Sequence, residues 1–171
     1  MNRYQNLIFA SLSILILAGC KASTSPTGTT TTPGSMIAHV NGSAWSSTVL
    51  PGISGGATGN IESGALFVTG LSATTNTEIT IELMNPKLGT DSLGATGDEG
   101  VYSQIAGADT TFYYSIPLVT SGELYDGAVT ITAYDSVGKT ISGTFNFVAR
   151  TKDLSSSVSV TNGSFYQVSW K

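Results

Sequence analysis

The sequence is poor in cysteine, histidine and charge. Its 171 residues include one Cys and one His. Only 11% of the residues are charged, whereas an ordinary soluble domain carries about 25%. A single Cys excludes a disulfide-bonded scaffold, because such a scaffold needs cysteine pairs. The net charge of -4 argues against a nucleic-acid binder, which needs a basic surface. The chain also lacks the high content of Ala, Glu, Lys, Leu and Arg that is typical of a coiled coil or a helical bundle, which argues against both.

Small neutral residues take the place of the charges. The chain contains 23 Ser, 24 Thr and 20 Gly, which together make up more than a third of it. Because 40% of the residues are hydrophobic and many alternate with polar ones, disorder throughout the chain is excluded. This composition indicates a β domain whose surface is solubilised by hydroxyl groups.

The first twenty residues have the organisation of a secretion signal. Arg3 supplies a positive charge, and residues 7–18 form an apolar run. This run is shorter than the roughly 20 apolar residues that a membrane-spanning helix needs. It ends in Leu-Ala-Gly-Cys at residues 17–20, which resembles the lipobox of bacterial lipoproteins at all four positions.

The lipobox resemblance implies a defined processing reaction. In that family a diacylglycerol group is attached to the cysteine thiol and a peptidase then cuts before the cysteine, so the cut here falls between Gly19 and Cys20. Cys20 then carries acyl chains such as palmitate, and two or three chains anchor a protein more firmly than one. The processed chain has no free thiol. Enterobacterial lipoproteins retained at the inner membrane carry Asp at the next position, so Lys21 favours the outer membrane.

Three segments follow from these features. Residues 1–19 are the signal peptide, 20–35 are the lipidated Cys and a Ser/Thr/Pro tether, and 36–171 are a single β domain. The tether shows no apolar alternation, and its Pro and Thr content favours an extended, solvated chain. About fifteen residues can span roughly 50 Å when stretched. The domain is therefore expected to work at some distance from the membrane.

Within the domain, apolar and polar residues alternate with a period of two and never with a helical period. The alternation is clearest at residues 77–84, 128–134 and 141–149, where Ile, Val and Phe alternate with Thr, Ser and Glu. A short polar segment joins the last two of these, which predicts a hairpin. We expect an all-β fold of about eight to ten antiparallel strands, arranged as a sandwich or a partly closed barrel.

The connections between the strands carry turn signals. Asn-Gly at residues 41–42 predicts a type I′ hairpin. Asn-Gly at residues 162–163 lies inside a strand-like stretch and is either a turn or a bulge. Residues 85–100 are rich in Gly and predict a loop with a short strand near 90–95.

Four short motifs lie near the two ends of the domain. They are Ala38-His39-Val40-Asn41-Gly42-Ser43-Ala44-Trp45, Gly127-Ala128-Val129-Thr130-Ile131-Thr132-Ala133-Tyr134-Asp135, Ile141-Ser142-Gly143-Thr144-Phe145-Asn146-Phe147 and Thr161-Asn162-Gly163-Ser164-Phe165. Together with the lipobox, they resemble an uncharacterised family of lipoproteins from Bacteroidota. The resemblance implies an envelope location and a β domain with a core Trp and inward Phe residues. It implies no activity, cofactor or catalytic residue.

The resemblance leaves open which way the domain faces. Surface-exposed members of that family often carry an acidic export signal directly after the Cys. Residues 21–24 contain no acidic pair. A periplasmic and a surface-facing location therefore both stay open.

The single His does not predict catalysis. His39 alternates with Ala38 and Val40, so we place it on the outer face of a strand and not in a Ser-His-Asp triad. With one His and one Cys, we expect no metal ligands and no cofactor.

The carboxylates are the remaining candidates for a catalytic or a metal site. Glu78 and Glu82 would lie roughly 13 Å apart along one strand, which is too far for the carboxylate pair of a glycosidase. Asp91, Asp98 and Glu99 fall in the Gly-rich segment, where a Ca²⁺ site or a hydrolase using loop carboxylates are alternatives. We interpret these carboxylates as solvated charges and expect no catalytic residue.

Aromatic residues are the better candidates for binding. Tyr113, Tyr134 and Tyr166 are expected on outward strand positions, where they would form a flat surface for a protein or glycan partner. The alternative is that each is a half-buried strand residue that shields its neighbours.

Three tripeptides resemble the Asp-Ser/Thr-apolar sites of O-glycosylation in Bacteroidota. Their acceptors would be Ser92, Thr110 and Ser136. The alternative is that Asp followed by Ser or Thr simply opens a turn.

The leading hypothesis is a lipid-anchored, non-catalytic envelope protein whose β domain binds a protein or glycan partner. The alternative is a β-barrel carrier of a small apolar ligand or lipid. Its pocket would be lined by inward Ile81, Ile131, Phe145 and Phe147.

Overall fold

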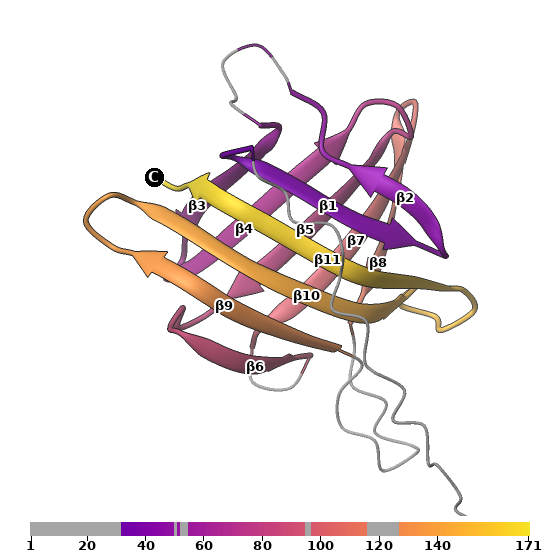
Figure 1. The fold of residues 1–171 in the computed structure, drawn as a ribbon. Coiled ribbons are helices and arrows are strands. Elements are labelled where there is room, and N and C mark those ends of the chain that lie inside the picture. Colours follow the sequence, from indigo (N-terminus) through magenta and orange to yellow (C-terminus); the bar gives the residue numbers. More distant parts are fainter. Residues whose placement is uncertain (1–31, 50, 52–54, 95–96, 116–126) are drawn as a thin grey trace, which may run out of the picture.

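The structure is a computed structural model that describes residues 32–49, 51, 55–94, 97–115 and 127–171. This part of the chain forms eleven strands and no helix. Figure 1 shows how the strands are arranged. The strands are β1 (Ser35–Val40), β2 (Ser43–Ser46), β3 (Ala57–Glu62), β4 (Ala65–Ser72), β5 (Thr77–Leu83), β6 (Gly89–Leu93), β7 (Glu99–Ala106), β8 (Asp109–Tyr114), β9 (Gly127–Asp135), β10 (Thr140–Arg150) and β11 (Ser157–Ser169). The all-β prediction is confirmed, with a strand count slightly above the expected one.

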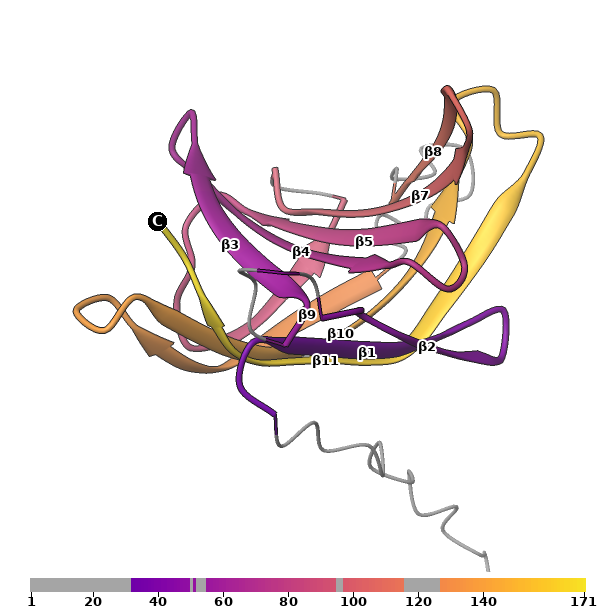
Figure 2. The same cartoon turned by 90° about the horizontal axis from the view of Figure 1, so that it is seen from above.

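The strands form one antiparallel sheet that is folded into two layers. Its order is β2-β1-β11-β10-β8-β7-β5-β4-β3, and β9 and β6 extend it from β10. Figure 2 shows β3, β4, β5, β7 and β8 as one layer, with β1, β2, β9, β10 and β11 below it. The predicted hairpin between β9 and β10 is confirmed.

Short contacts join the two layers at their sides. On one side, β10 meets β8 at a single register pair, Arg150 and Tyr114. On the other side, two isolated bridges join Ser35 to Gly56 and Gly59 of β3 to Trp170. None of these contacts is a continuous ladder, so the fold lies between the sandwich and the partly closed barrel that the sequence predicted.

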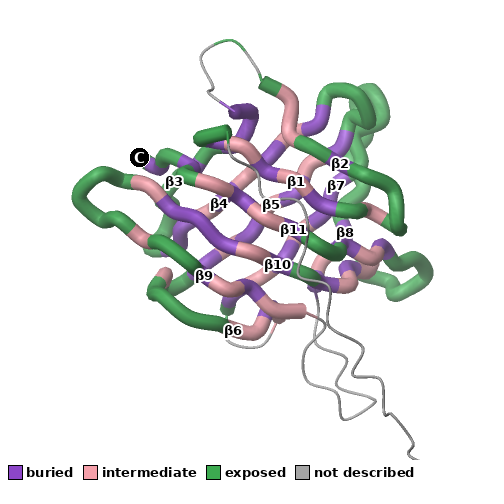
Figure 3. Tube along the Cα trace, in the orientation of Figure 1, coloured by how far each residue is buried: buried purple, intermediate pink, exposed green. Residues whose placement is uncertain are grey.

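Alternation along the strands builds the core between the two layers. Figure 3 shows buried positions alternating with intermediate or exposed ones along several strands, as in β4, β5 and β11. Ile79, Ile81 and Leu83 of β5 are at most 2% exposed, while the residues between them are half-buried. Burying such side chains stabilises the fold by about 1.5–3 kcal/mol each. Trp45, a predicted core residue, is 5% exposed, and its Nε1 donates to Thr77 Oγ1 at 2.8 Å.

Three stacked phenylalanines occupy the middle of the core. The ring of Phe145 lies 6.1 Å from that of Phe147 and 6.2 Å from that of Phe165. A Cβ added to Gly163 would lie 2.3 Å from the Phe145 ring, and one added to Gly143 would lie 2.7 Å from the Phe165 ring. The two glycines therefore leave the space that the phenylalanine rings occupy, and a larger residue at either glycine would collide with a ring.

The Asn-Gly signals take two different forms. Asn41 and Gly42 have φ values of 49° and 80°, as a type I′ turn requires, so the predicted hairpin between β1 and β2 is confirmed. Asn162 has a φ of 52° but lies inside β11, where the register with both neighbouring strands shifts. The second Asn-Gly pair is therefore a bulge and not a turn.

The irregular segment between β5 and β7 connects the two layers. It contains β6, close to the short strand predicted near residues 90–95. β6 pairs with β9 of the other layer, while β5 pairs directly with β7. Among the described residues, no helix is long and apolar enough to cross a membrane.

Candidate functional site

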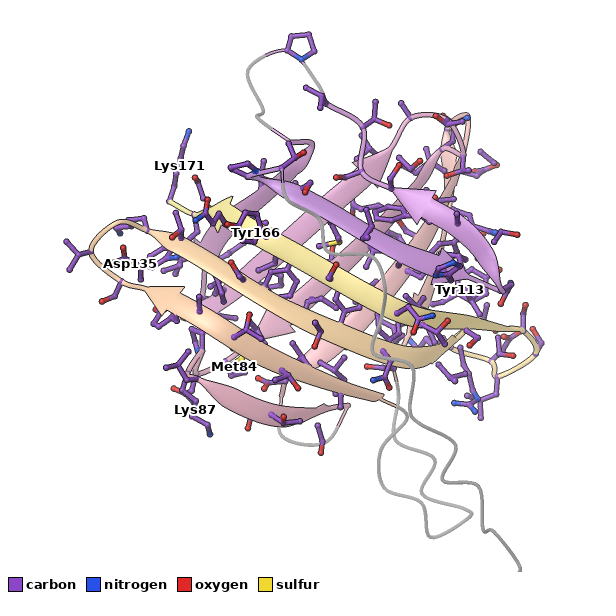
Figure 4. All side chains as sticks on the ribbon, viewed as in Figure 1. Met84, Lys87, Tyr113, Asp135, Tyr166 and Lys171 are labelled. Atoms are coloured by element: carbon purple, nitrogen blue, oxygen red, sulfur yellow. The ribbon has the colours of Figure 1, made fainter. Side chains whose placement is uncertain are left out.

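A cleft opens at the end of the fold where the chain leaves β5 for β6. Its volume is about 420 Å³. The residues that line it are Ile61, Gly64, Leu66, Met84, Asn85, Pro86, Lys87 and Tyr134. They come from the β3–β4 hairpin, the β5–β6 connection and the end of β9, and Figure 4 shows Met84 and Lys87 at this end next to β6. A cleft of this size suits a small-molecule group rather than a protein surface.

The side chain of Tyr134 forms the aromatic wall of the cleft. Its ring is stacked on that of Trp170, with 6.1 Å between centroids and 8° between planes. The ammonium group of Lys139 lies 4.3 Å from the centre of the Trp170 ring. Trp170 is 6% exposed, and a Cβ added to Gly59 would lie 2.4 Å from its Cβ. Tyr134 is thus held by a partner that is itself fixed by packing.

A bulge in β9 turns Tyr134 toward this position. Ala133 is opposite Ser142 and Ile131 is opposite Gly143, so Thr132 has no opposing residue. The extra residue reverses the alternation, which places Tyr134 opposite buried Ile141 on the inner side of the sheet. The predicted outward orientation of Tyr134 is therefore wrong, although Tyr134 does line a cleft.

Tyr113 is also placed differently from the prediction. It is 7% exposed and packs on Tyr102, with 5.8 Å between ring centroids. The β7–β8 register pairs these two tyrosines on the inner side and puts Phe112 and Tyr114 outward. Residues 112–114 are all aromatic, so the pattern is equally consistent with Tyr113 pointing inward or outward. The sequence therefore could not determine on which face of the sheet Tyr113 lies.

Tyr166 is half-buried and follows buried Phe165, which places it on the outer face of β11. It therefore lies on the face opposite to that of Tyr134. The structure does not bring the three tyrosines into one surface, so the flat outer platform that the sequence predicted is not formed.

The rim of the cleft combines apolar and polar groups. Ile61 and Met84 are 47% and 39% exposed, so the rim presents two large apolar side chains to solvent. Lys87 Nζ lies 3.4 Å from Asp91 Oδ1, so the charge at the rim is paired. The Met84 amide donates to Asp98 Oδ1 at 2.8 Å, which anchors the start of the β5–β6 connection.

The carboxylates form a pair that sequence reasoning did not find. The β5–β7 register sets Glu82 directly opposite Glu99. Burial raises the pKa of Glu99, and the neighbouring Glu82 carboxylate raises it further. Burial and the nearby Asp98 carboxylate likewise raise the pKa of Glu82. Within the described ranges, no three His, Cys, Asp or Glu side chains are grouped so that they could hold a metal ion.

The remaining predicted sites have these positions. His39 is exposed on β1, as predicted. Of the glycosylation candidates, Thr110 and Ser136 are exposed, and Ser92 is half-buried. The Asp135 carboxylate accepts hydrogen bonds from the amides of Val137 and Gly138, which is the turn-opening role. Cys20 and Gly19 lie outside the described residues.

A family comparison covers nearly the whole of this fold. The model of a domain of unknown function, DUF6252, matches residues 33–169. The chain belongs to the DUF6252 family. The DUF6252 domain therefore runs from the start of β1 to the end of β11 and includes every element that lines the cleft. No curated protein and no solved structure matches the chain.

The DUF6252 domain offers groups for binding at this cleft. The ring of Tyr134 can stack on a flat ring, Asn85 carries an amide, and Lys87 carries a paired ammonium group. The β3–β4 hairpin, the β5–β6 connection and the end of β9 all contribute to the wall, which is why no contiguous sequence motif marks it.

Proposed function

We propose that the chain is a lipid-anchored envelope protein whose DUF6252 domain binds a glycan at the Tyr134 cleft without catalysing a reaction. The observation that carries this proposal is the Tyr134–Trp170 stack on the wall of a cleft of about 420 Å³. Sugar rings present a flat face of C–H groups that packs well on such an aromatic wall. The glycan is favoured over a protein partner because the cleft has the size of a small-molecule site.

The chemistry of the cleft supports a binding role. Among the described residues that line it, Lys87 is the one basic side chain and is paired with Asp91, and none is a carboxylate, a His or a Cys. His39 is exposed on β1, which does not line the cleft. The groups that face a ligand are instead an aromatic ring, an amide and apolar side chains, which bind without reacting.

The expected effect of removing the aromatic wall can be measured on a glycan array and by calorimetry. The mature lipoprotein in detergent should bind a subset of glycans, and Tyr134→Ala should weaken that binding about tenfold, equivalent to about 1.4 kcal/mol. Tyr166→Ala is the matched control because that ring lies on the opposite face. Equal losses in the two variants would place the site elsewhere.

A second candidate function is favoured by the apolar rim. Ile61, Leu66 and Met84 give the same cleft an apolar side that suits a lipid or another small apolar ligand. The interior positions first considered for such a carrier, Ile131 and Phe145, are only 3% exposed in the packed core. A lipid that copurifies with the wild type and is absent from Met84→Asp would support the carrier over the glycan binder.

The anchor rests on the Leu-Ala-Gly-Cys tetrapeptide at residues 17–20. Cys20→Ser should block acylation and cleavage after Gly19, so the protein should retain its signal peptide. Intact mass of the wild type from native membranes should show a chain beginning at Cys20 with acyl chains. Additional mass in hexose steps would indicate O-glycosylation at Ser92, Thr110 or Ser136.

A further inference from the structure

One face of the fold combines exposed aromatic rings with unbalanced negative charge. We define the acidic aromatic face by the outward residues Glu78, Glu82, Glu99, Val101, Phe112 and Tyr114 of β5, β7 and β8. The register makes it continuous, because Val101 is paired with Tyr114 on one side and with Thr80, between the two β5 glutamates, on the other. It lies on the outer side of the layer that is uppermost in Figure 2.

The aromatic part of this face is exposed although it is large and apolar. Phe112 is 48% exposed, and its ring is stacked on that of Tyr114 at 6.2 Å. Ile105, the outward residue of β7 that follows Ser103, is 36% exposed. Thr occupies other outward positions of this layer, such as Thr69, Thr80 and Thr110, and would keep the strand soluble equally well. A rigid exposed aromatic pair is typical of a contact surface.

The charged part of this face works against folding. Glu82 and Glu99 are directly opposite each other, and like charges at such positions destabilise a sheet. No Lys, Arg or His occurs on β4, β5, β7 or β8, so these strands supply no cation to the pair. Arg150, in register with Tyr114, is the nearest basic position in the sheet and lies beyond the aromatic pair. A partner that brings positive charge would relieve the repulsion.

We propose that the acidic aromatic face docks an extended basic polypeptide segment. Its Lys or Arg side chains would pair with the glutamates, and its apolar side chains would pack on Phe112 and Tyr114. Glu78 and Glu82 are four residues apart on one strand, so two cationic groups about 13 Å apart match them. Charge complementarity selects this partner, because an anionic lipid surface would be repelled by the same glutamates. The docking face is separate from the cleft and does not depend on the glycan proposal.

The test uses two synthetic peptides and the full mature lipoprotein in detergent. One peptide of twelve residues repeats Lys-Ser-Val-Ser three times, so that Lys and Val share one face when it is extended and successive Lys are about 13 Å apart; its partner carries Glu in place of Lys. The Lys peptide should bind the wild type, and binding should weaken as salt is raised from 50 to 500 mM. The Glu peptide should not bind. Failure of the Lys peptide to bind the wild type at low salt would overturn the proposal.

Three variants then locate the binding. Combined Glu78→Gln and Glu82→Gln should weaken Lys-peptide binding at least tenfold, and Phe112→Ser should weaken it at least threefold. Glu62→Gln, an exposed glutamate of β3 outside this face, should leave binding unchanged. The double variant should also unfold at a higher temperature than the wild type, which separates lost binding from lost structure. Equal loss in Glu62→Gln, or no loss in the double variant, would overturn the assignment of the face.

Discussion

The packing of Phe145 on Gly163 yields a quantitative prediction about the core. A Cβ added to Gly163 would lie 2.3, 2.4 and 2.6 Å from three atoms of the Phe145 ring. The ring cannot retreat, because Phe147 and Phe165 are stacked near it at 6.1 and 6.2 Å. Gly163 does not have a left-handed φ, so its replacement introduces crowding and no backbone strain. We expect Gly163→Ala to lower the free energy of unfolding by about 3 kcal/mol, at the upper end of overpacking effects.

A double-mutant cycle tests whether crowding is the cause. Phe145→Leu alone should lower the free energy of unfolding by about 2 kcal/mol, because it removes ring atoms from the core. It also removes the atoms that a methyl group added to Gly163 would meet. The free energy of unfolding lost in the double variant should therefore be about 1–2 kcal/mol smaller than the sum of the losses in the two single variants.

Urea unfolding at 25 °C measures these differences, and for a domain of this size about 3 kcal/mol corresponds to roughly 10 °C in melting temperature. Gly42→Ala is the matched control. Gly42 has a φ of 80° and no atom within 4 Å of an added Cβ, so its loss of about 1 kcal/mol comes from the backbone alone. That loss should not change when Phe145→Leu is added. The crowding argument is refuted if the losses of Gly163→Ala and Phe145→Leu are additive.

Two further predictions concern polar groups. Thr77→Val should lower the free energy of unfolding by about 1–3 kcal/mol, because the buried Trp45 Nε1–H loses its acceptor; Thr58→Val, at an exposed position, should change it little in the same urea titration. Glu82→Gln should raise the free energy of unfolding at pH 7 by roughly 0.5 kcal/mol after allowance for solvent screening. The folded state raises the pKa of Glu82 above its ordinary value of 4.5, so the fold is favoured below that pH and loses stability as pH rises through the raised pKa. The difference between wild type and Glu82→Gln should therefore shrink toward pH 4, and a difference constant from pH 4 to 7 would contradict the assignment.

Local sequence signals predicted the class of the fold because antiparallel pairing between chain neighbours is largely local. The Asn-Gly pair at residues 41–42 specified its turn through backbone conformation alone. The β9–β10 hairpin followed from two alternating segments and a short polar connection. Strand β3 was not predicted, because the run Ala-Thr-Gly-Asn-Ile-Glu has few apolar residues and gains its order by pairing with β4.

The orientation of individual aromatic side chains could not be predicted in the same way. A single extra residue, Thr132, reverses the face on which Tyr134 lies, and nothing in the neighbouring sequence marks the bulge. For Tyr113 the deciding partner is Tyr102, which belongs to another strand. Both outcomes depend on register between strands, and the apolar pattern of one strand does not contain that information.

The candidate cleft depends on long-range pairing. Ile61 of β3, Met84 of the β5–β6 connection and Tyr134 of β9 meet because β6 leaves the layer of β5 and pairs with β9. Apart from buried Leu66, the lining residues are exposed or half-buried and follow no pattern in the sequence. A sequence signal for the site would have required the β6–β9 pairing to be known in advance.

The low charge of the chain explains why a few carboxylates can define a docking face. In an ordinary domain about one residue in four is charged, so each glutamate has oppositely charged neighbours that average out its field. Here 11% of the residues are charged. The Lys and Arg residues of the described ranges are Lys87, Lys139, Arg150, Lys152 and Lys171. All five lie in connections or at strand ends, and none is on the strands that carry Glu78, Glu82 and Glu99. Hydroxyl groups keep the rest of the surface soluble without adding charge. The negative charge of these glutamates is therefore not offset by cations on the same strands and can attract a cationic partner.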